Sequence, residues 1–270
     1  MPSSLLFWDV DTQFDFMHPA GKLYVPGAEA IIPNLQRLTS FAVQHGIPIV
    51  ASTDAHLEAD PEFSQYPPHG LAGTSGQKKV EGTLFPQHYI IPNRKIDLPR
   101  DLACYLEIIV EKQTVDVFTN PNADSLLKLL GHREIILYGV VTEICVDRAV
   151  RGLIKRGYCV HVVEDATRHL NSRRGYATIQ HVRRHVRRLN RTWNSGTIER
   201  PASRAHQMLR VTPATEAETQ GFRKPNLHLA RAISEAHISC RVRFLDTHSS
   251  GPILQNPPTG PEYFSRGFRR

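Results

Sequence analysis

Short apolar runs alternate with helix-like segments in the first two thirds of this chain, and this alternation constrains the fold more than any other feature. Residues 5–10 form one apolar run and residues 47–52 form the next. Between them, apolar residues recur at helical spacing over residues 27–45, and Gly46 follows as a stop signal. A strand, a helix and a second strand in this order form a βαβ unit, which predicts a parallel sheet.

The same alternation continues toward the C-terminus. Residues 89–91 are a candidate edge strand, and residues 164–167 are expected to form the loop after the last strand. The sequence therefore predicts a three-layer α/β/α, Rossmann-like fold with a central, mainly parallel sheet. The further expected strands are residues 106–112, 134–138 and 158–163, and the further expected helices are residues 123–130, 145–156 and 172–184.

The basic character of the chain is concentrated near its C-terminus. The net charge is +7, and residues 183–270 contain sixteen Lys and Arg against six Asp and Glu. From about residue 187 the sequence loses its periodicity and becomes rich in Arg, Ser, Pro and Thr. We therefore predict one folded domain over residues 1–186 and a basic, disordered C-terminal extension over residues 187–270.

Two hypotheses concern this extension. It could be an unrelated extension or the translation of a shifted reading frame, because no Val- and Thr-rich final strand is found in it. Its flexible, Arg-rich composition also raises nucleic-acid binding through phosphates as an alternative function of a different class. Against that alternative, the basic residues are scattered and no RRM, KH, zinc-finger or helix-turn-helix pattern is present.

The cysteines and the first residues suggest a compartment. The four cysteines form no C-x-x-C pair and no dense framework, so a reducing environment is the simplest interpretation. Residues 1–9 lack a basic segment before an apolar one and are too short to span a membrane. A soluble, cytoplasmic protein with no membrane partner is therefore expected.

Three residues with chemical potential follow predicted strands. Asp11, Lys112 and Cys145 each come at or just after the end of an apolar run, and such ends share one edge of a parallel sheet. Alone, each has an ordinary explanation: a turn aspartate, a surface lysine and a buried structural cysteine. Together they indicate covalent catalysis, with Asp11 taking the thiol proton and Lys112 stabilising charge. Cys145 begins a helix, whose positive N-terminal field is expected to lower the thiol pKa.

A second group of residues suits a metal ion. Asp54 and His56 follow the second strand, and Glu62 and His69 lie in the loop after it. Carboxylate and imidazole ligands suit a divalent ion such as Zn²⁺, Mn²⁺ or Fe²⁺. The spacing alone is a weak signal, because the chain has 14 histidines and these could be solvated loop residues.

The motifs resemble those of a known superfamily. Residues 10–16 (VDTQFDF) resemble the D-x-Q-x-D-F opening of the isochorismatase-like cysteine hydrolases. Residues 139–146 (GVVTEICV) resemble their G-x-x-T-x-x-C-V segment, and Lys112 stands where that superfamily has its catalytic lysine. The resemblance covers roughly residues 4–182 and implies the isochorismatase-like fold.

Within that superfamily the sequence is most similar to the nicotinamidases (pyrazinamidases). Residues 54–56 match their D-x-H pair, and residues 66–69 resemble their W-P-x-H segment with Tyr in place of Trp. The resemblance implies hydrolysis of nicotinamide to nicotinate and ammonia through a thioester, a role in NAD salvage, and a divalent metal cofactor. The implied metal ligands are Asp54, His56, Glu62 and His69, and the implied pocket residues are Phe16, Tyr66 and Val140.

The resemblance also implies an oxyanion hole and leaves the substrate open. It predicts a cis peptide bond between Val140 and Val141, with the N–H groups of Val141 and Cys145 as the oxyanion donors. Residues 113–116 and 77–105 depart from the nicotinamidase pattern, so another small amide, ureido or carbamoyl substrate is the alternative. The expected partner is a small amide substrate, and a homo-oligomer is left open.

Overall fold

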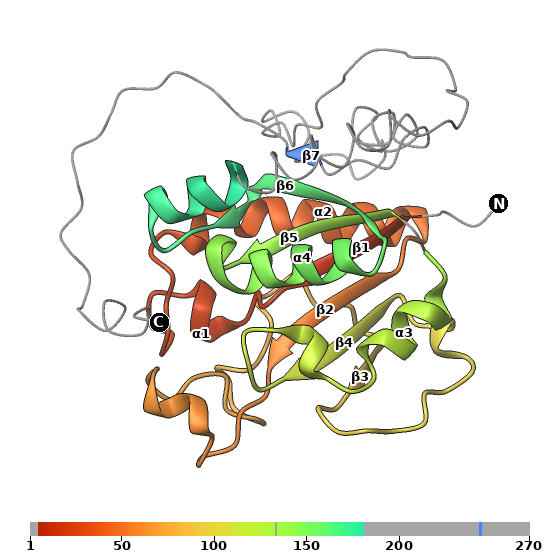
Figure 1. Ribbon diagram of the computed structural model, residues 1–270, viewed down its shortest axis with the longest axis horizontal. Coiled ribbons are helices and arrows are strands. Elements are labelled where there is room, and N and C mark those ends of the chain that lie inside the picture. Colours follow the sequence, from red (N-terminus) through yellow and green to blue (C-terminus); the bar gives the residue numbers. More distant parts are fainter. Residues whose placement is uncertain (1–4, 133, 181–242, 245–270) are drawn as a thin grey trace.

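A parallel sheet forms the centre of the computed structural model, which describes residues 5–132, 134–180 and 243–244 (Figure 1). The strand order is β3-β4-β2-β1-β5-β6-β7, and every pair of neighbours is parallel. The strands are β1 (Leu5–Val10), β2 (Ile49–Asp54), β3 (His88–Ile91), β4 (Glu107–Lys112), β5 (Glu134–Val140), β6 (Cys159–Arg168) and the two-residue β7 (Arg243–Phe244).

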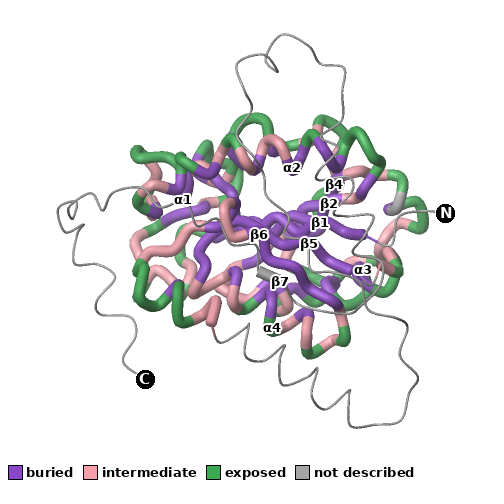
Figure 2. The backbone as a smooth tube through the Cα atoms, turned by 90° about the horizontal axis from the view of Figure 1, so that it is seen from above, coloured by how far each residue is buried: buried purple, intermediate pink, exposed green. Residues whose placement is uncertain are grey.

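Helices cover both faces of this sheet. Helix α2 lies on one side, and helices α3 and α4 lie on the other (Figure 2). The predicted three-layer α/β/α fold is therefore confirmed. The α-helices are α1 (Phe14–Met17), α2 (Ile32–His45), α3 (Ala123–Leu130) and α4 (Asp147–Lys155), and residues 172–180 are also helical. Short 3₁₀ turns are η1 (Ala28–Ile31), η2 (Pro61–Ser64), η3 (Leu102–Cys104) and η4 (Val117–Thr119), and η5 (Thr142–Val146) is a π-helical turn.

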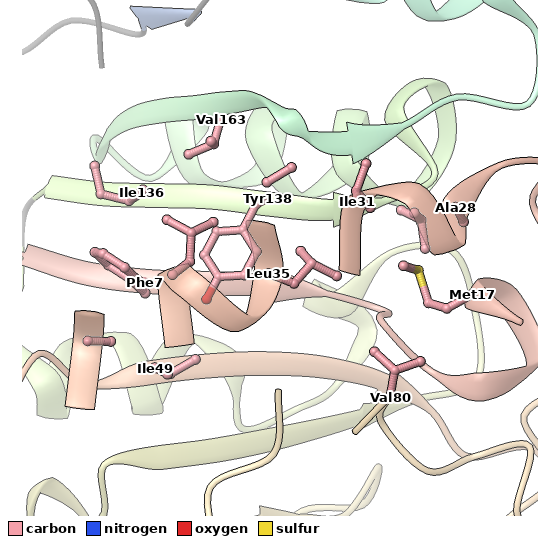
Figure 3. Close-up of a cluster of buried hydrophobic side chains, with 14 of the residues drawn as sticks. Phe7, Met17, Ala28, Ile31, Leu35, Ile49, Val80, Ile136, Tyr138 and Val163 are labelled. Atoms are coloured by element: carbon pink, nitrogen blue, oxygen red, sulfur yellow. The ribbon is translucent and has the colours of Figure 1, made fainter. Parts of the chain in front are cut away.

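The alternation of side chains along β1 separates two hydrophobic cores. Leu5 and Phe7 point toward α2, whereas Leu6 and Trp8 point toward α3 and α4. Figure 3 shows Phe7 beside Tyr138 of β5, with the two rings 6.1 Å apart and nearly perpendicular. Burying each large apolar side chain contributes about 1.5–3 kcal/mol, so the two cores hold the sheet as a rigid platform.

Two boundaries differ from the sequence prediction. Strand β2 starts at Ile49 rather than at residue 47, because Pro48 has no N–H to contribute to a ladder. At its other end the strand extends to Asp54 rather than ending at residue 52. The predicted loop at residues 164–167 is wrong, because β6 continues to Arg168. A register shift absorbs the extra residues: Leu137 pairs with Val162, but Gly139 pairs with residue 167.

The predicted extension, residues 187–270, lies outside the described residues except for β7. The hypothesis about the origin of this extension and the hypothesis of nucleic-acid binding therefore also concern residues outside the described part of the chain. In the part of the chain that the structure describes, no helix is both long and apolar enough to cross a membrane.

Candidate active site

Asp11 and Lys112 meet at the carboxyl ends of the strands. Lys112 ends β4, directly beside Asp54 at the end of β2. Its ammonium lies 2.9 Å from Asp11 Oδ2 and also forms an ion pair with Asp54. The other Asp11 oxygen accepts a hydrogen bond of 2.7 Å from the Ser52 hydroxyl. The parallel register therefore gathers one lysine between two carboxylates in the interior.

Burial and these contacts set the charges of the group. Burial would lower the pKa of Lys112, but the charges of Asp11 and Asp54 outweigh it and hold that pKa well above the ordinary lysine value. Burial raises the pKa of Asp11, although the Lys112 charge opposes the rise. Lys112 is thus a cation at neutral pH, and Asp11 has an increased proton affinity.

Cys145 lies in η5, between β5 and α4. The preceding peptide bond between Val140 and Val141 is cis, as the resemblance implied. Gly139 permits the close approach of this turn to β1: its φ is 117°, and a Cβ at this position would lie 2.1 Å from the Val10 carbonyl oxygen. The strand-to-helix turn therefore delivers the thiol to the same edge of the sheet as Asp11.

The expectation of a lowered thiol pKa is wrong. Burial raises the pKa of the Cys145 thiol well above its ordinary value, and Asp11 and Asp54 act in the same direction. The Lys112 charge opposes this rise without overcoming it. The resting thiol is therefore neutral, and a nucleophilic role requires a base beside it. Asp11 fits that requirement, since it lies close enough to the Cys145 thiol to raise the pKa of that thiol.

Asp54, His56 and His69 form a buried group that could hold a metal ion. One ligand atom from each lies within 4.8 Å of the others. Asp54 Oδ2 lies 3.8 Å from His56 Nε2 and 3.5 Å from His69 Nε2, distances at which an ion can lie between the atoms. His56 Nε2 is buried and has no hydrogen-bond partner among the described residues. An orphaned imidazole nitrogen aimed at a carboxylate fits a divalent metal ligand.

Outer contacts fix the two imidazole rings. His56 Nδ1 lies 3.0 Å from a carboxylate oxygen of Asp60, and His69 Nδ1 lies 2.8 Å from the Pro67 carbonyl oxygen. Both rings consequently present Nε2 toward Asp54. Metal-bound histidines commonly use their second nitrogen in this way, which makes Asp60 part of the site. The sequence reasoning missed Asp60, although its position four residues after His56 was a usable signal.

Glu62 is near this group without belonging to it. It lies in η2 and lines the recess beside Cys145, but it is not among the three residues whose ligand atoms converge. Burial raises the pKa of Glu62, and the Asp54 charge raises it further. Glu62 therefore has an increased proton affinity and faces the place where a substrate would lie.

Gln13 and Asp15 explain the D-x-Q-x-D-F pattern. The Gln13 side chain accepts a hydrogen bond from the Asp54 N–H at 2.6 Å and donates one to the Asp54 carbonyl at 2.9 Å. Asp15 accepts a hydrogen bond of 2.8 Å from the Gly70 N–H, next to His69. The two side chains therefore fasten both segments of the candidate metal group to the segment that carries Asp11. The sequence reasoning assigned neither role.

A recess of about 390 Å³, including its open mouth, lies over these groups. Phe16 and Tyr66 line it, as the resemblance implied, and Val141, which was expected only as an oxyanion donor, lines it as well. The predicted pocket residue Val140 does not line it, because its side chain packs in the core beneath α2. The polar residues of the wall are Asp54, Glu62, His69 and Cys145, and the other apolar ones are Leu23, Val25, Val115, Ile144 and Leu170.

The chain is similar in sequence to proteins of known name. Ureidoacrylate amidohydrolase RutB of Agrobacterium fabrum is 36% identical over 155 residues, which are 54% of this chain and 65% of that protein. The chain thus spans less than two thirds of the length of the curated relatives that it first matches.

Solved structures agree in fold over most of their own length. The pyrazinamidase/nicotinamidase of Streptococcus mutans has a TM-score of 0.56 and 23% identity, over 67% of this chain and 96% of that one. The pyrazinamidase of Pyrococcus horikoshii in complex with zinc has a TM-score of 0.54 and 25% identity, over 66% and 93%. Residues 4–192 match the family described as the isochorismatase domain. The chain therefore belongs to the isochorismatase domain family.

Proposed function

We propose that this protein hydrolyses a small, uncharged carboxamide through a thioester on Cys145, with nicotinamide as the favoured substrate. The observation that carries the proposal is the placement of the thiol beside Asp11 and Lys112, in the wall of an apolar recess. A general base beside a neutral thiol is the arrangement that nucleophilic catalysis by cysteine needs.

The first half of the reaction transfers the acyl group to sulfur. Asp11 takes the proton of the Cys145 thiol, and the sulfur attacks the carboxamide carbon. The backbone N–H groups of Val141 and Cys145 are the donors proposed for the resulting oxyanion. Asp11 then gives its proton to the leaving nitrogen, the C–N bond breaks, and ammonia departs. Lys112 stays protonated throughout and balances the charge on Asp11.

The second half releases the acid. Asp11, again a carboxylate, takes a proton from a water molecule that attacks the thioester carbon. The C–S bond breaks, the sulfur recovers a proton, and the carboxylic acid leaves the recess. Asp54, His56 and His69 are the residues that would hold a divalent cation. Such an ion, when bound, would supply Lewis acidity to water or to an aromatic nitrogen of the substrate.

The recess walls favour an uncharged substrate. Phe16, Tyr66 and Leu170 offer apolar surface suited to a flat ring, whereas Asp54 and Glu62 add negative potential. Among the described residues that line the recess, none is Lys or Arg. A substrate carrying its own carboxylate would thus find no cationic side chain in the wall, and only a bound metal ion would balance its charge.

Hydrolysis of a ureido or carbamoyl compound is the second candidate. The 36% identity to a ureidoacrylate amidohydrolase favours it, and Val115, in the segment that departs from the nicotinamidase pattern, lines the recess. The two candidates differ in the charge of the substrate, since ureidoacrylate is an anion and nicotinamide is neutral.

Ammonia release from the zinc-loaded full chain separates the two candidates. We expect nicotinamide to be turned over with a kcat/KM at least about tenfold above that for ureidoacrylate, and Cys145→Ala to abolish turnover of both. Preferred turnover of ureidoacrylate would transfer the protein to the second candidate. Turnover of neither compound would refute both assignments.

A further inference from the structure

We propose that Glu134, Cys159 and His161 form a second metal site, for zinc, at the opposite edge of the sheet from the candidate active site. Glu134 is the first residue of β5, and Cys159 is the first residue of β6. The carboxyl end of β5 leads into the turn that carries Cys145. The two sites are therefore separated by the length of the strands.

The backbone brings the three side chains together. Glu134 and Cys159 are direct partners in the parallel register of β5 and β6. His161 follows Cys159 by two residues and so lies on the same face of the sheet. His161 Nε2 lies 2.8 Å from Glu134 Oε1 and 3.7 Å from Cys159 Sγ. The three ligand atoms all lie within 4.8 Å of one another.

All three groups are withdrawn from solvent. The exposed fractions are 8% for Glu134, 6% for Cys159 and 2% for His161. Burying a carboxylate, an imidazole and a thiol at one point costs free energy unless the groups share a counter-charge. Glu134 and His161 already contact each other at 2.8 Å, and a divalent cation between the three groups would also supply a counter-charge for the thiolate.

The donor set selects zinc. Thiolate sulfur, imidazole nitrogen and carboxylate oxygen are the ligands that zinc takes in proteins, and a tetrahedral ion holds such atoms about 3.3–3.7 Å apart. The sulfur–nitrogen separation of 3.7 Å already matches that range, and the oxygen–nitrogen separation of 2.8 Å needs only a small rotation of Glu134. On binding, the Cys159 thiol loses its proton to solvent and becomes the thiolate ligand.

A catalytic relay does not account for the same contacts. In a relay, the thiol and the carboxylate face different nitrogens of the imidazole ring. Here Glu134 and Cys159 both approach Nε2 of His161. One nitrogen cannot serve both neighbours as a hydrogen-bond partner in line, whereas one ion can be coordinated by all three atoms at once.

The position of the site suggests a structural role. Three protein ligands leave a fourth coordination position for water. The ion would connect the first residues of the neighbouring strands β5 and β6. Strand β5 leads into the turn that carries Cys145, so a clamp on its start supports the sheet under the active site. If zinc binds the folded state and not the unfolded state, its binding free energy adds to the free energy of unfolding.

Cobalt(II) titration tests the proposal, because a cobalt–thiolate bond gives a charge-transfer band in the near ultraviolet. The full chain is used with Cys145→Ala throughout, so that the active-site thiol cannot contribute. We expect the band in this variant and its loss on adding Cys159→Ser. The band should persist when His56→Ala and His69→Ala are added together. It should also persist when Cys104→Ser is added as the matched thiol control. Zinc should displace cobalt and remove the band.

Absence of the band in the Cys145→Ala chain, or its persistence after Cys159→Ser, would overturn the proposal. Far-ultraviolet circular dichroism checks that each variant is folded. If Cys159→Ser does not fold, Glu134→Gln keeps the thiol and removes one ligand, and it should weaken cobalt binding by at least about tenfold. An unchanged binding midpoint in Glu134→Gln would contradict the site equally.

Discussion

The Gln13 side chain pairs with both backbone groups of Asp54, accepting from its N–H at 2.6 Å and donating to its carbonyl at 2.9 Å. Its amide nitrogen also donates to the Gln77 carbonyl at 2.8 Å. One buried amide thus fixes Asp54, a candidate metal ligand, relative to the segment that carries Asp11. Gln13 lies two residues after Asp11, and its amide group can both accept and donate a hydrogen bond, which explains why glutamine suits this point of the motif.

Gln13→Glu should destabilise the protein and loosen the metal group. The carboxylate cannot donate to the two carbonyl oxygens and brings an unpaired charge into the interior, which we expect to cost about 3 kcal/mol. The free energy of unfolding in urea and zinc affinity are the measurements. Gln87→Glu is the exposed control and should change neither; equal effects of the two variants would refute the role of Gln13.

Asp60→Asn should weaken metal binding while leaving the fold intact. Asparagine can still cap η2 through the Glu62 N–H, as Asp60 does at 3.0 Å, but it removes the charge beside His56 Nδ1. Loss of such an outer partner typically lowers metal affinity by about 10–100-fold. Zinc competition titrations measure it, with exposed Asp97→Asn as the control. Unaltered zinc affinity in Asp60→Asn would exclude this contribution.

Lys79 gives the stability a predictable dependence on alkaline pH. Its ammonium lies 2.9 Å from Asp9 and also pairs with Glu107 in the interior. Burial would lower the pKa of Lys79, but the two carboxylates outweigh it and raise that pKa above the ordinary value of 10.5. The folded state binds this proton more tightly than the unfolded state. Its contribution is therefore complete below pH 10.5 and is lost as pH rises through the folded-state pKa.

Lys79→Met should lower the free energy of unfolding by about 3–5 kcal/mol at neutral pH, because it leaves two buried carboxylates without their cation. It should also make the fall in stability above pH 10.5 shallower, although Lys112 contributes a similar slope. Urea unfolding at several pH values measures both effects. The neighbouring exposed Lys78→Met is the control, and an identical alkaline slope in wild type and Lys79→Met would contradict the assignment.

Gly139→Ala should be much more costly than Gly131→Ala. Both glycines have positive φ, 117° and 67°, but only the Cβ at residue 139 would meet backbone, at 2.1 Å from the Val10 carbonyl oxygen. Conformational strain alone predicts about 1 kcal/mol at Gly131. We expect at least about 3 kcal/mol at Gly139, where β1 and β5 must separate. Equal unfolding midpoints of the two variants would disprove the close-approach argument.

The fold and the convergence of Asp11, Lys112 and Cys145 were predictable because both depend on local patterns. Apolar runs mark the strands, and residues at the carboxyl ends of parallel strands must lie along one edge. The extension of β6 was missed because Glu164 and Asp165 are polar, and only the bulge in the paired strands accommodates them. Side-chain pattern alone does not reveal a register shift.

The electrostatics and the apolar walls were beyond local reasoning. The helix N-terminus suggested a lowered pKa for Cys145, but burial and two carboxylates from other strands determine the opposite direction. Leu23 and Leu170 line the recess from segments far apart in the sequence, and neither stands in a distinctive motif. Both the pKa of Cys145 and the lining of the recess depend on residues that only the tertiary structure brings together.

The central claim is that Cys145 performs the chemistry, and the most direct measurement compares ammonia release from nicotinamide by the wild-type chain and by Cys145→Ala under the same zinc loading. The account predicts measurable release by the wild type and a loss of at least about 10³-fold in the variant, which should retain the wild-type circular dichroism spectrum. Undiminished ammonia release by a folded Cys145→Ala protein would contradict it.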